Sequence, residues 1–204
     1  MSQTFIGVKQ VNPMKQRLDM DEICYEKIVE FVKAGHQVMI FVHARNATVN
    51  TAMVMKEKAQ QNGETELFTP EECVQLGTAK NAVEKSRNRQ LKELFHAGFG
   101  IHHAGMLRSD RNLVEKYFGA GHIKVLVCTA TLAWGVNLPA HGVIIKGTEV
   151  SPQAASLLRN KCLSFTLSRS TTRSEAVLLM SASWTFCRYL VELGGLSLTS
   201  PATG

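Results

Sequence analysis

Hydroxyl, amide and glycine groups follow a largely apolar segment in the second half of the chain. Residues Ile123–Cys128 lead into the loop Thr129-Ala130-Thr131, then into the turn Trp-Gly-Val-Asn-Leu-Pro, and a second apolar segment follows at Val143–Ile145. Apolar runs of this length, broken by turns, are typical of buried parallel strands. Because ligands of open α/β sheets bind beyond the carboxyl ends of the strands, these groups are placed to meet phosphates and ribose.

A second candidate loop follows the apolar run that includes Phe41 and Val42. There the sequence continues His43-Ala44-Arg45 where a predicted strand gives way to a predicted helix. Backbone amides at a helix start and a guanidinium are both good phosphate ligands. The plainer alternative is that Arg45 only caps or solvates the start of the helix.

The third candidate loop is His102-His103-Ala104-Gly105-Met106. Adjacent side chains on extended chain point in opposite directions, so the two histidines make a poor chelate and a metal site is not expected. A core or capping role for one of them is the commoner fate. Gly105 lets the backbone approach a partner closely. Beyond the loop, Arg108 and Arg111 either reach phosphates or face solvent.

The bulk composition favours a single domain with an anionic partner. The chain has 204 residues, 45% of them hydrophobic, and a formal net charge of +6. This charge is compatible with nucleic acid, and equally with a mildly basic solvated surface. Five cysteines without a Cys-x-x-Cys pair indicate free thiols in a reducing compartment rather than zinc or disulfides. Without a signal-peptide pattern or a run of membrane-spanning length, we expect no membrane contact and a nuclear and cytoplasmic location.

The alternation of predicted strands and helices defines the fold class. Strands are predicted at 4–8, 38–42, 99–102, 123–128 and 143–145, and helices at about 13–34, 46–58, 82–95 and 108–118, with 64–80 irregular. This order predicts an α/β, doubly wound parallel sheet. We predict one domain at 1–150, incomplete at its C-terminal side. Residues 151–204 are rich in Ser, Leu and Thr with little periodicity, and are predicted to form a divergent, irregular or weakly helical and poorly ordered tail.

The chain resembles a known family through the segments FVHAR, GIHHAGM and TATLAWGVNLPAH. Together they are similar to the second RecA-like domain of superfamily 2 helicases, in the class of the spliceosomal unwinding helicase. The resemblance covers roughly residues 2–150, and its most specific motif is the one around Trp134. It implies a RecA-like fold and the second motor half of an ATP-dependent helicase that moves 3′ to 5′ on nucleic acid.

The resemblance also implies which residues meet which ligand. Contacts to the nucleic-acid backbone are implied for His43, Arg45, His103, Gly105, Arg108, Thr129, Ala130 and Thr131. Gly135 and Asn137 match positions that face the nucleotide. Trp134 either packs in the core or stacks on a base.

The motifs that cleave ATP in such motors do not occur in this sequence. There is no Gly-x-x-x-x-Gly-Lys-Ser/Thr loop, no Asp-Glu-x-His stretch, and no Gln-x-x-Gly-Arg-x-Gly-Arg motif. A phosphate loop, metal-holding acids and transition-state cations are all needed for hydrolysis. No catalytic residue is therefore assigned, and ATP and Mg²⁺ are expected only together with the first RecA-like domain.

Three functional interpretations follow from the sequence. The chain is the second motor half of a helicase, with single-stranded DNA or RNA and the first RecA-like domain as partners. Alternatively it is a non-catalytic fragment that binds nucleic acid or a partner protein. In the third interpretation the tail prevents stable folding and the chain has no function.

Overall fold

The computed structural model describes residues 2–8, 10, 12–70, 74–129, 132, 138, 140–146 and 175–181. In chain order the elements are β1 (Ser2–Val8), α1 (Pro13–Lys33), β2 (Val38–Val42), α2 (Arg45–Gln61), α3 (Thr65–Phe68), α4 (Val74–Glu84), α5 (Arg89–His96), β3 (Phe99–His102), α6 (Arg108–Gly119), β4 (Val125–Thr129), β5 (Gly142–Lys146) and β6 (Glu175–Ser181).

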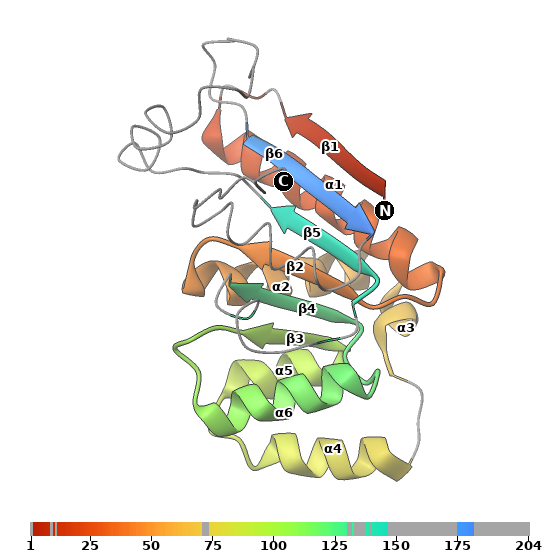
Figure 1. The fold of residues 1–204 in the computed structure, drawn as a ribbon, viewed down its shortest axis with the longest axis vertical. Helices are drawn as coiled ribbons and strands as arrows, with labels where there is room; N and C mark the ends of the chain where they lie inside the picture. Colours follow the sequence, from red (N-terminus) through yellow and green to blue (C-terminus); the bar gives the residue numbers. More distant parts are fainter. Residues whose placement is uncertain are drawn as a thin grey trace, which may run out of the picture.

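The strands form one sheet in the order β1-β6-β5-β2-β4-β3 (Figure 1). β5, β2, β4 and β3 pair in parallel, whereas β6 is antiparallel to both β5 and β1. Every residue of β2, β3 and β4 is buried, as expected for parallel strands covered on both faces. The predicted α/β, RecA-like parallel sheet is therefore confirmed.

Helices cover both faces of the parallel part of the sheet. Gly142 and Lys146 of β5 face α1, because a Cβ at Gly142 would meet the ring of Phe31 and Lys146 binds Asp21. Ile145 of β5 points to the face opposite that of Gly142 and Lys146. His102 lies in register with Cys128, Phe41 and this Ile145, so it shares their face of the sheet, and it contacts Glu115 of α6. Because side chains alternate between the faces of a strand, α6 covers the face opposite α1. The sheet is therefore doubly wound.

The segment predicted as one helix over 82–95 is two helices, and the single-helix prediction is wrong. α4 ends at Glu84, and α5 begins at Arg89 after a turn. The side chain of Asn88 accepts a hydrogen bond from the Leu91 amide at 3.1 Å, so Asn88 caps a new helix. The segment predicted as irregular, 64–80, contains α3 and most of α4.

β6 lies in the region where the sequence pattern predicts an irregular or weakly helical tail. It occupies the position between β1 and β5 and pairs with both. Its sequence, EAVLLMS, is a short apolar run without alternation, and such a run fits a strand with a neighbour on each side. The rest of the predicted tail lies outside the described residues, so the division of the chain at residue 150 stays a prediction.

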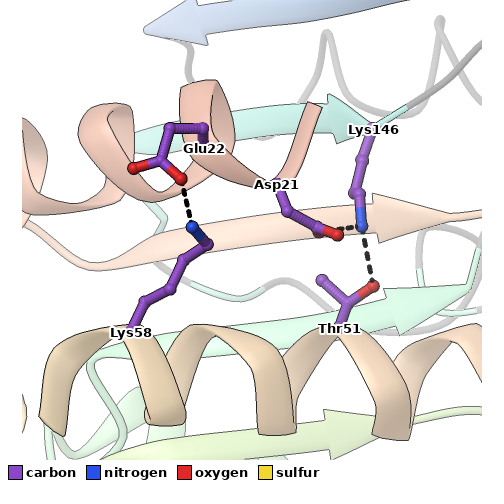
Figure 2. A network of polar contacts seen from close by, with 5 residues as sticks. All are labelled: Asp21, Glu22, Thr51, Lys58 and Lys146. Carbon is purple, nitrogen blue, oxygen red and sulfur yellow. Dashed lines mark hydrogen bonds and ion pairs between the residues drawn. The ribbon is translucent and has the colours of Figure 1, made fainter. Parts of the chain in front are cut away.

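A buried ion pair joins α1, α2 and β5 beneath the sheet (Figure 2). The Lys146 ammonium donates to the Asp21 carboxylate and to the Thr51 hydroxyl, the latter at 3.3 Å. The side chains of Lys146 and Asp21 are only 10% and 7% exposed. Nearby, Lys58 of α2 pairs with Glu22 of α1 in a more exposed position. α1 and α2 are therefore joined twice, once in the interior through Lys146 and once nearer the surface through Lys58.

Within the described part of the chain, no helix has the length and apolar character needed to cross a membrane.

Candidate nucleic-acid interface

The loops singled out by the sequence meet at the carboxyl edge of the parallel sheet. β4 lies between β2 and β3, with Val42 in register with Thr129 and His102 in register with Cys128. The end of β4 at Thr129 is therefore flanked by the loop after β2 and by the loop after β3. In Figure 1 the arrowheads of these three parallel strands all point to the left. This is the edge at which open α/β sheets bind their ligands.

Arg45 and the β3 loop lie against each other across this edge. A Cβ added at Gly105 would be 3.5 Å from Cδ of Arg45 and 3.1 Å from Nδ1 of His103. A larger residue at position 105 would therefore press on both side chains. The absence of a side chain at Gly105 allows this close approach, and the two loops form one continuous surface; the predicted contact of Gly105 with nucleic acid stays a prediction.

His103 organises the backbone of its own loop. Its Nδ1 accepts a hydrogen bond from the Gly105 amide at 3.1 Å, and its carbonyl accepts one from the Met106 amide at 3.1 Å. Met106 is buried beneath the loop. The loop is therefore held in a fixed shape before any ligand binds, which lowers the ordering cost of binding.

The two adjacent histidines have different roles, as their opposite directions predict. His102 is buried, and its Nε2 lies 2.8 Å from a carboxylate oxygen of Glu115 on α6. This contact ties the strand before the loop to the helix after it. His103 is half-buried at the edge beside Arg45. Nothing in the sequence pattern singles out Glu115, since a polar residue on a partly exposed helix face has no distinguishing signal.

Neither histidine supplies the positive charge of this edge at neutral pH. Burial lowers the pKa of His102, and the opposing effect of Glu115 is smaller. Burial, followed by the nearby Arg45, lowers the pKa of His103. Both imidazoles are therefore neutral near pH 7, and the permanent charge comes from the exposed guanidinium groups of Arg45 and Arg108.

Two helices begin at this edge without a side-chain cap. α2 starts at Arg45 after Ala44, and α6 starts at Arg108 after Leu107, and in neither case does the N-cap side chain accept a hydrogen bond. Uncapped amides at a helix start attract anions. Arg45 is thus the first residue of its helix, with an exposed side chain; this fits both a phosphate contact and the plainer alternative of a solvated side chain, so the contact of Arg45 with nucleic acid stays a prediction.

Arg108 and Arg111 differ in exposure, although exposure alone does not separate the two options left by the sequence. Arg108 is exposed at the first position of α6. Arg111 is half-buried, and its Nε is buried without a hydrogen-bond partner among the described residues. Of the two, Arg108 is the one placed to reach a phosphate in solvent.

Thr129 is the first residue of the motif TATLAWGVNLPAH, of which the structure also describes Leu132, Leu138, Ala140 and His141. It ends β4, and its side chain is mostly buried, at 8% exposed. The other predicted residues of this motif, Ala130, Thr131, Gly135 and Asn137, together with Trp134, lie outside the described residues. Their contacts to nucleic acid and nucleotide therefore stay predictions. His43, predicted for the same surface, is exposed in the loop after β2.

The fold and this edge define a RecA-like domain, and the comparisons with known proteins specify the class. Residues 65–157 match the helicase conserved C-terminal domain. The chain therefore carries a helicase C-terminal domain of superfamily 2, as its motifs indicate.

The chain matches a short part of much longer proteins. It is similar to activating signal cointegrator 1 complex subunit 3 of Mus musculus (63% identical) and of Homo sapiens (61% identical), in each case over 150 residues. It is also 53% identical over 150 residues to the DExH-box ATP-dependent RNA helicase DExH14 of Arabidopsis thaliana. Each match covers 74% of this chain but only 7% of the relative.

Proposed function

We propose that this chain supplies the second motor half of an ATP-dependent helicase, which moves 3′ to 5′ along single-stranded nucleic acid. The observation that carries the proposal is the meeting of Arg45, the His103–Gly105 loop and Thr129 at one edge of the sheet. These groups offer a guanidinium, backbone amides and a hydroxyl, which suit phosphates and sugars rather than bases. The expected contacts are therefore independent of sequence.

In this proposal the chain works only with partners. A first RecA-like domain would supply the phosphate loop and the metal-holding acids, and would bind ATP and Mg²⁺. Gly135 and Asn137 would close the nucleotide cleft from this side. ATP would favour a closed arrangement of the two halves. The closed and open arrangements would bind the strand with different affinities, and this difference in affinity would couple hydrolysis to movement. Other subunits of the cointegrator complex are further candidate partners, by analogy with the relatives' name.

Binding to single-stranded nucleic acid should be weak, tolerant of sequence and steeply dependent on salt. We expect Arg45→Ala to weaken binding roughly two- to fivefold, because an exposed charge contact contributes up to about 1 kcal/mol. Thr129→Val should weaken binding by a similar factor through the loss of one hydrogen bond. Both effects should be similar for different oligonucleotides. The measurement is fluorescence anisotropy with labelled oligothymidylate and a mixed-sequence strand across a salt series.

Lys116→Ala is the matched control for this experiment. Lys116 is an exposed cation in the last turn of α6, near the amino edge of the sheet, so its loss should change affinity little. An affinity that ignores salt would contradict the proposed interface. So would an effect of Arg45→Ala confined to one oligonucleotide sequence.

The isolated chain should show no ATP hydrolysis that is stimulated by nucleic acid. The sequence lacks the phosphate loop, the Asp-Glu-x-His acids and the Gly-Arg-x-Gly-Arg cations, which together stabilise the transition state of phosphoryl transfer. The test is phosphate release with and without single strand, using the Arg45→Ala protein, purified in the same way, to reveal contaminating activity. Turnover that rises with added strand in the wild type, and falls in the variant, would refute the expectation.

A further inference from the structure

Three exposed cations gather on the short turn between α4 and α5. The turn reads Lys85-Ser86-Arg87-Asn88-Arg89, with exposed Lys85, Arg87 and Arg89 alternating with half-buried Ser86 and Asn88. We call these three cations the basic turn. Such a density of like charge is electrostatically unfavourable unless an anion offsets it.

The turn holds these cations outward by hydrogen bonds of its inward residues. The Ser86 hydroxyl accepts from the Asn88 amide at 3.0 Å, and the Ser86 amide donates to the Val83 carbonyl at 2.9 Å. The Asn88 side chain in turn caps α5. The polar residues are thus used for local structure, which fixes the backbone of the turn and leaves the charged residues in solvent.

The acidic residues near the turn are already engaged. Glu84 contacts Lys92 at 3.5 Å and His96 at 3.1 Å. Glu93 pairs with Lys56 at 2.6 Å, and this hydrogen bond holds the pKa of Glu93 below its usual range, with Arg89 a smaller contributor. Among the described residues, no ion pair is formed by Lys85, Arg87 or Arg89.

The position of the turn connects it with the candidate interface. α5 ends at His96, two residues separate it from the start of β3 at Phe99, and it packs along that strand. Its start at Arg89 therefore lies toward the carboxyl end of β3, on the side where α6 begins at Arg108 (Figure 1). The basic turn thus extends the positive carboxyl edge outward past β3.

We propose that the basic turn is an auxiliary phosphate-binding surface, which contacts a nucleic-acid strand after it leaves the loops at Arg45 and Gly105. This inference rests on the proposed function. A strand backbone fits because its phosphates recur regularly and can meet several separated cations at once, whatever the base sequence. The contact would add affinity and salt dependence without sequence preference.

The test compares Arg87→Gln/Arg89→Gln with the matched double variant Lys116→Gln/Lys124→Gln, which removes the same charge near the amino edge. The probe is a labelled oligothymidylate long enough to cross the whole carboxyl edge. We expect the turn variant to bind roughly three- to tenfold more weakly. Its slope of log affinity against log salt should be shallower by about 1.4, or about 0.7 for each lost single-strand phosphate contact. Lys85→Gln, which lies outside both helices, gives a second variant and should produce about half of this change in slope.

Two further arms separate the possible failures. If wild type binds and Arg45→Ala weakens binding, but the turn variants match the control, the basic turn is not part of the interface and only this inference fails. If the wild type does not bind the oligothymidylate at low salt, the proposed function fails with it. Polyglutamate tests an acidic protein partner: variants that lose polyglutamate binding but keep oligothymidylate affinity would overturn the proposal.

Discussion

Gly98→Ala should destabilise the fold by about 4 kcal/mol or more, a large part of the total stability of a domain of this size. Gly98 has a φ of +77°, and a Cβ at this position would lie 1.8 Å from the carbonyl oxygen of Phe68. That neighbour is backbone, so no side-chain rotation relieves the clash. The Gly98 carbonyl also accepts the Lys124 amide at 2.8 Å. Phe68, fully buried and stacked on Phe99 at 5.0 Å between ring centroids, would be displaced with it.

Gly121→Ala is the control for this prediction. Gly121 has a similar φ of +82°, but an added Cβ would meet nothing within 4 Å. Its substitution should therefore cost only the backbone strain of the left-handed region, about 1–2 kcal/mol. Urea denaturation followed by circular dichroism compares the two. Equal losses of stability in both variants would contradict the close contact between Gly98 and α3.

The second large effect is expected for Lys146→Met, which should lower the free energy of unfolding by about 3 kcal/mol. The change leaves the Asp21 carboxylate buried without its cation, and breaking a buried pair at one partner costs about 3–5 kcal/mol. Replacing both partners, as in Asp21→Leu/Lys146→Met, removes the uncompensated charge and should recover much of the loss.

Figure 2 also supplies the control for this pair. Lys58→Met breaks the neighbouring contact to Glu22, where the carboxylate side chain is 59% exposed. An exposed pair contributes at most about 1 kcal/mol, so this variant should stay close to the wild type in the same denaturation experiment. A loss for Lys146→Met no larger than that for Lys58→Met would contradict the burial of the Asp21–Lys146 pair.

The parallel core of the fold could be predicted from the sequence because its strands are apolar and short. Val38–Val42 and Phe99–His102 are observed with the predicted bounds, and the strands near 125–129 and 142–146 are shifted by one or two residues. The break between α4 and α5 was missed because helical periodicity continues across it, while the deciding feature is the single cap formed by Asn88. β6 was missed because a strand inserted between two others needs no alternating pattern and depends on distant partners.

The candidate interface was predictable where a motif ends a strand. Arg45, Gly105 and Thr129 were each placed at a strand end, and the parallel register then brings these ends together. The contact between His102 and Glu115 could not be predicted. It joins β3 to α6, and which side of α6 is turned toward β3 depends on how the two elements pack. The basic turn could not be recognised from the sequence, because its residues were assigned to a single charged helix over 82–95. The alternation of exposed cations with half-buried Ser86 and Asn88 appears only in the structure.

The most direct test of the account is a map of amide chemical-shift changes on titration with a single-stranded oligonucleotide. The isotope-labelled chain at low salt is titrated to saturation and compared with the Arg45→Ala variant. We predict that the largest changes fall at the carboxyl edge, on residues 43–47, 103–108 and Thr129, and that they weaken together in the variant. Changes concentrated at the opposite edge, around Gln37, Lys124 and His141, would contradict the account.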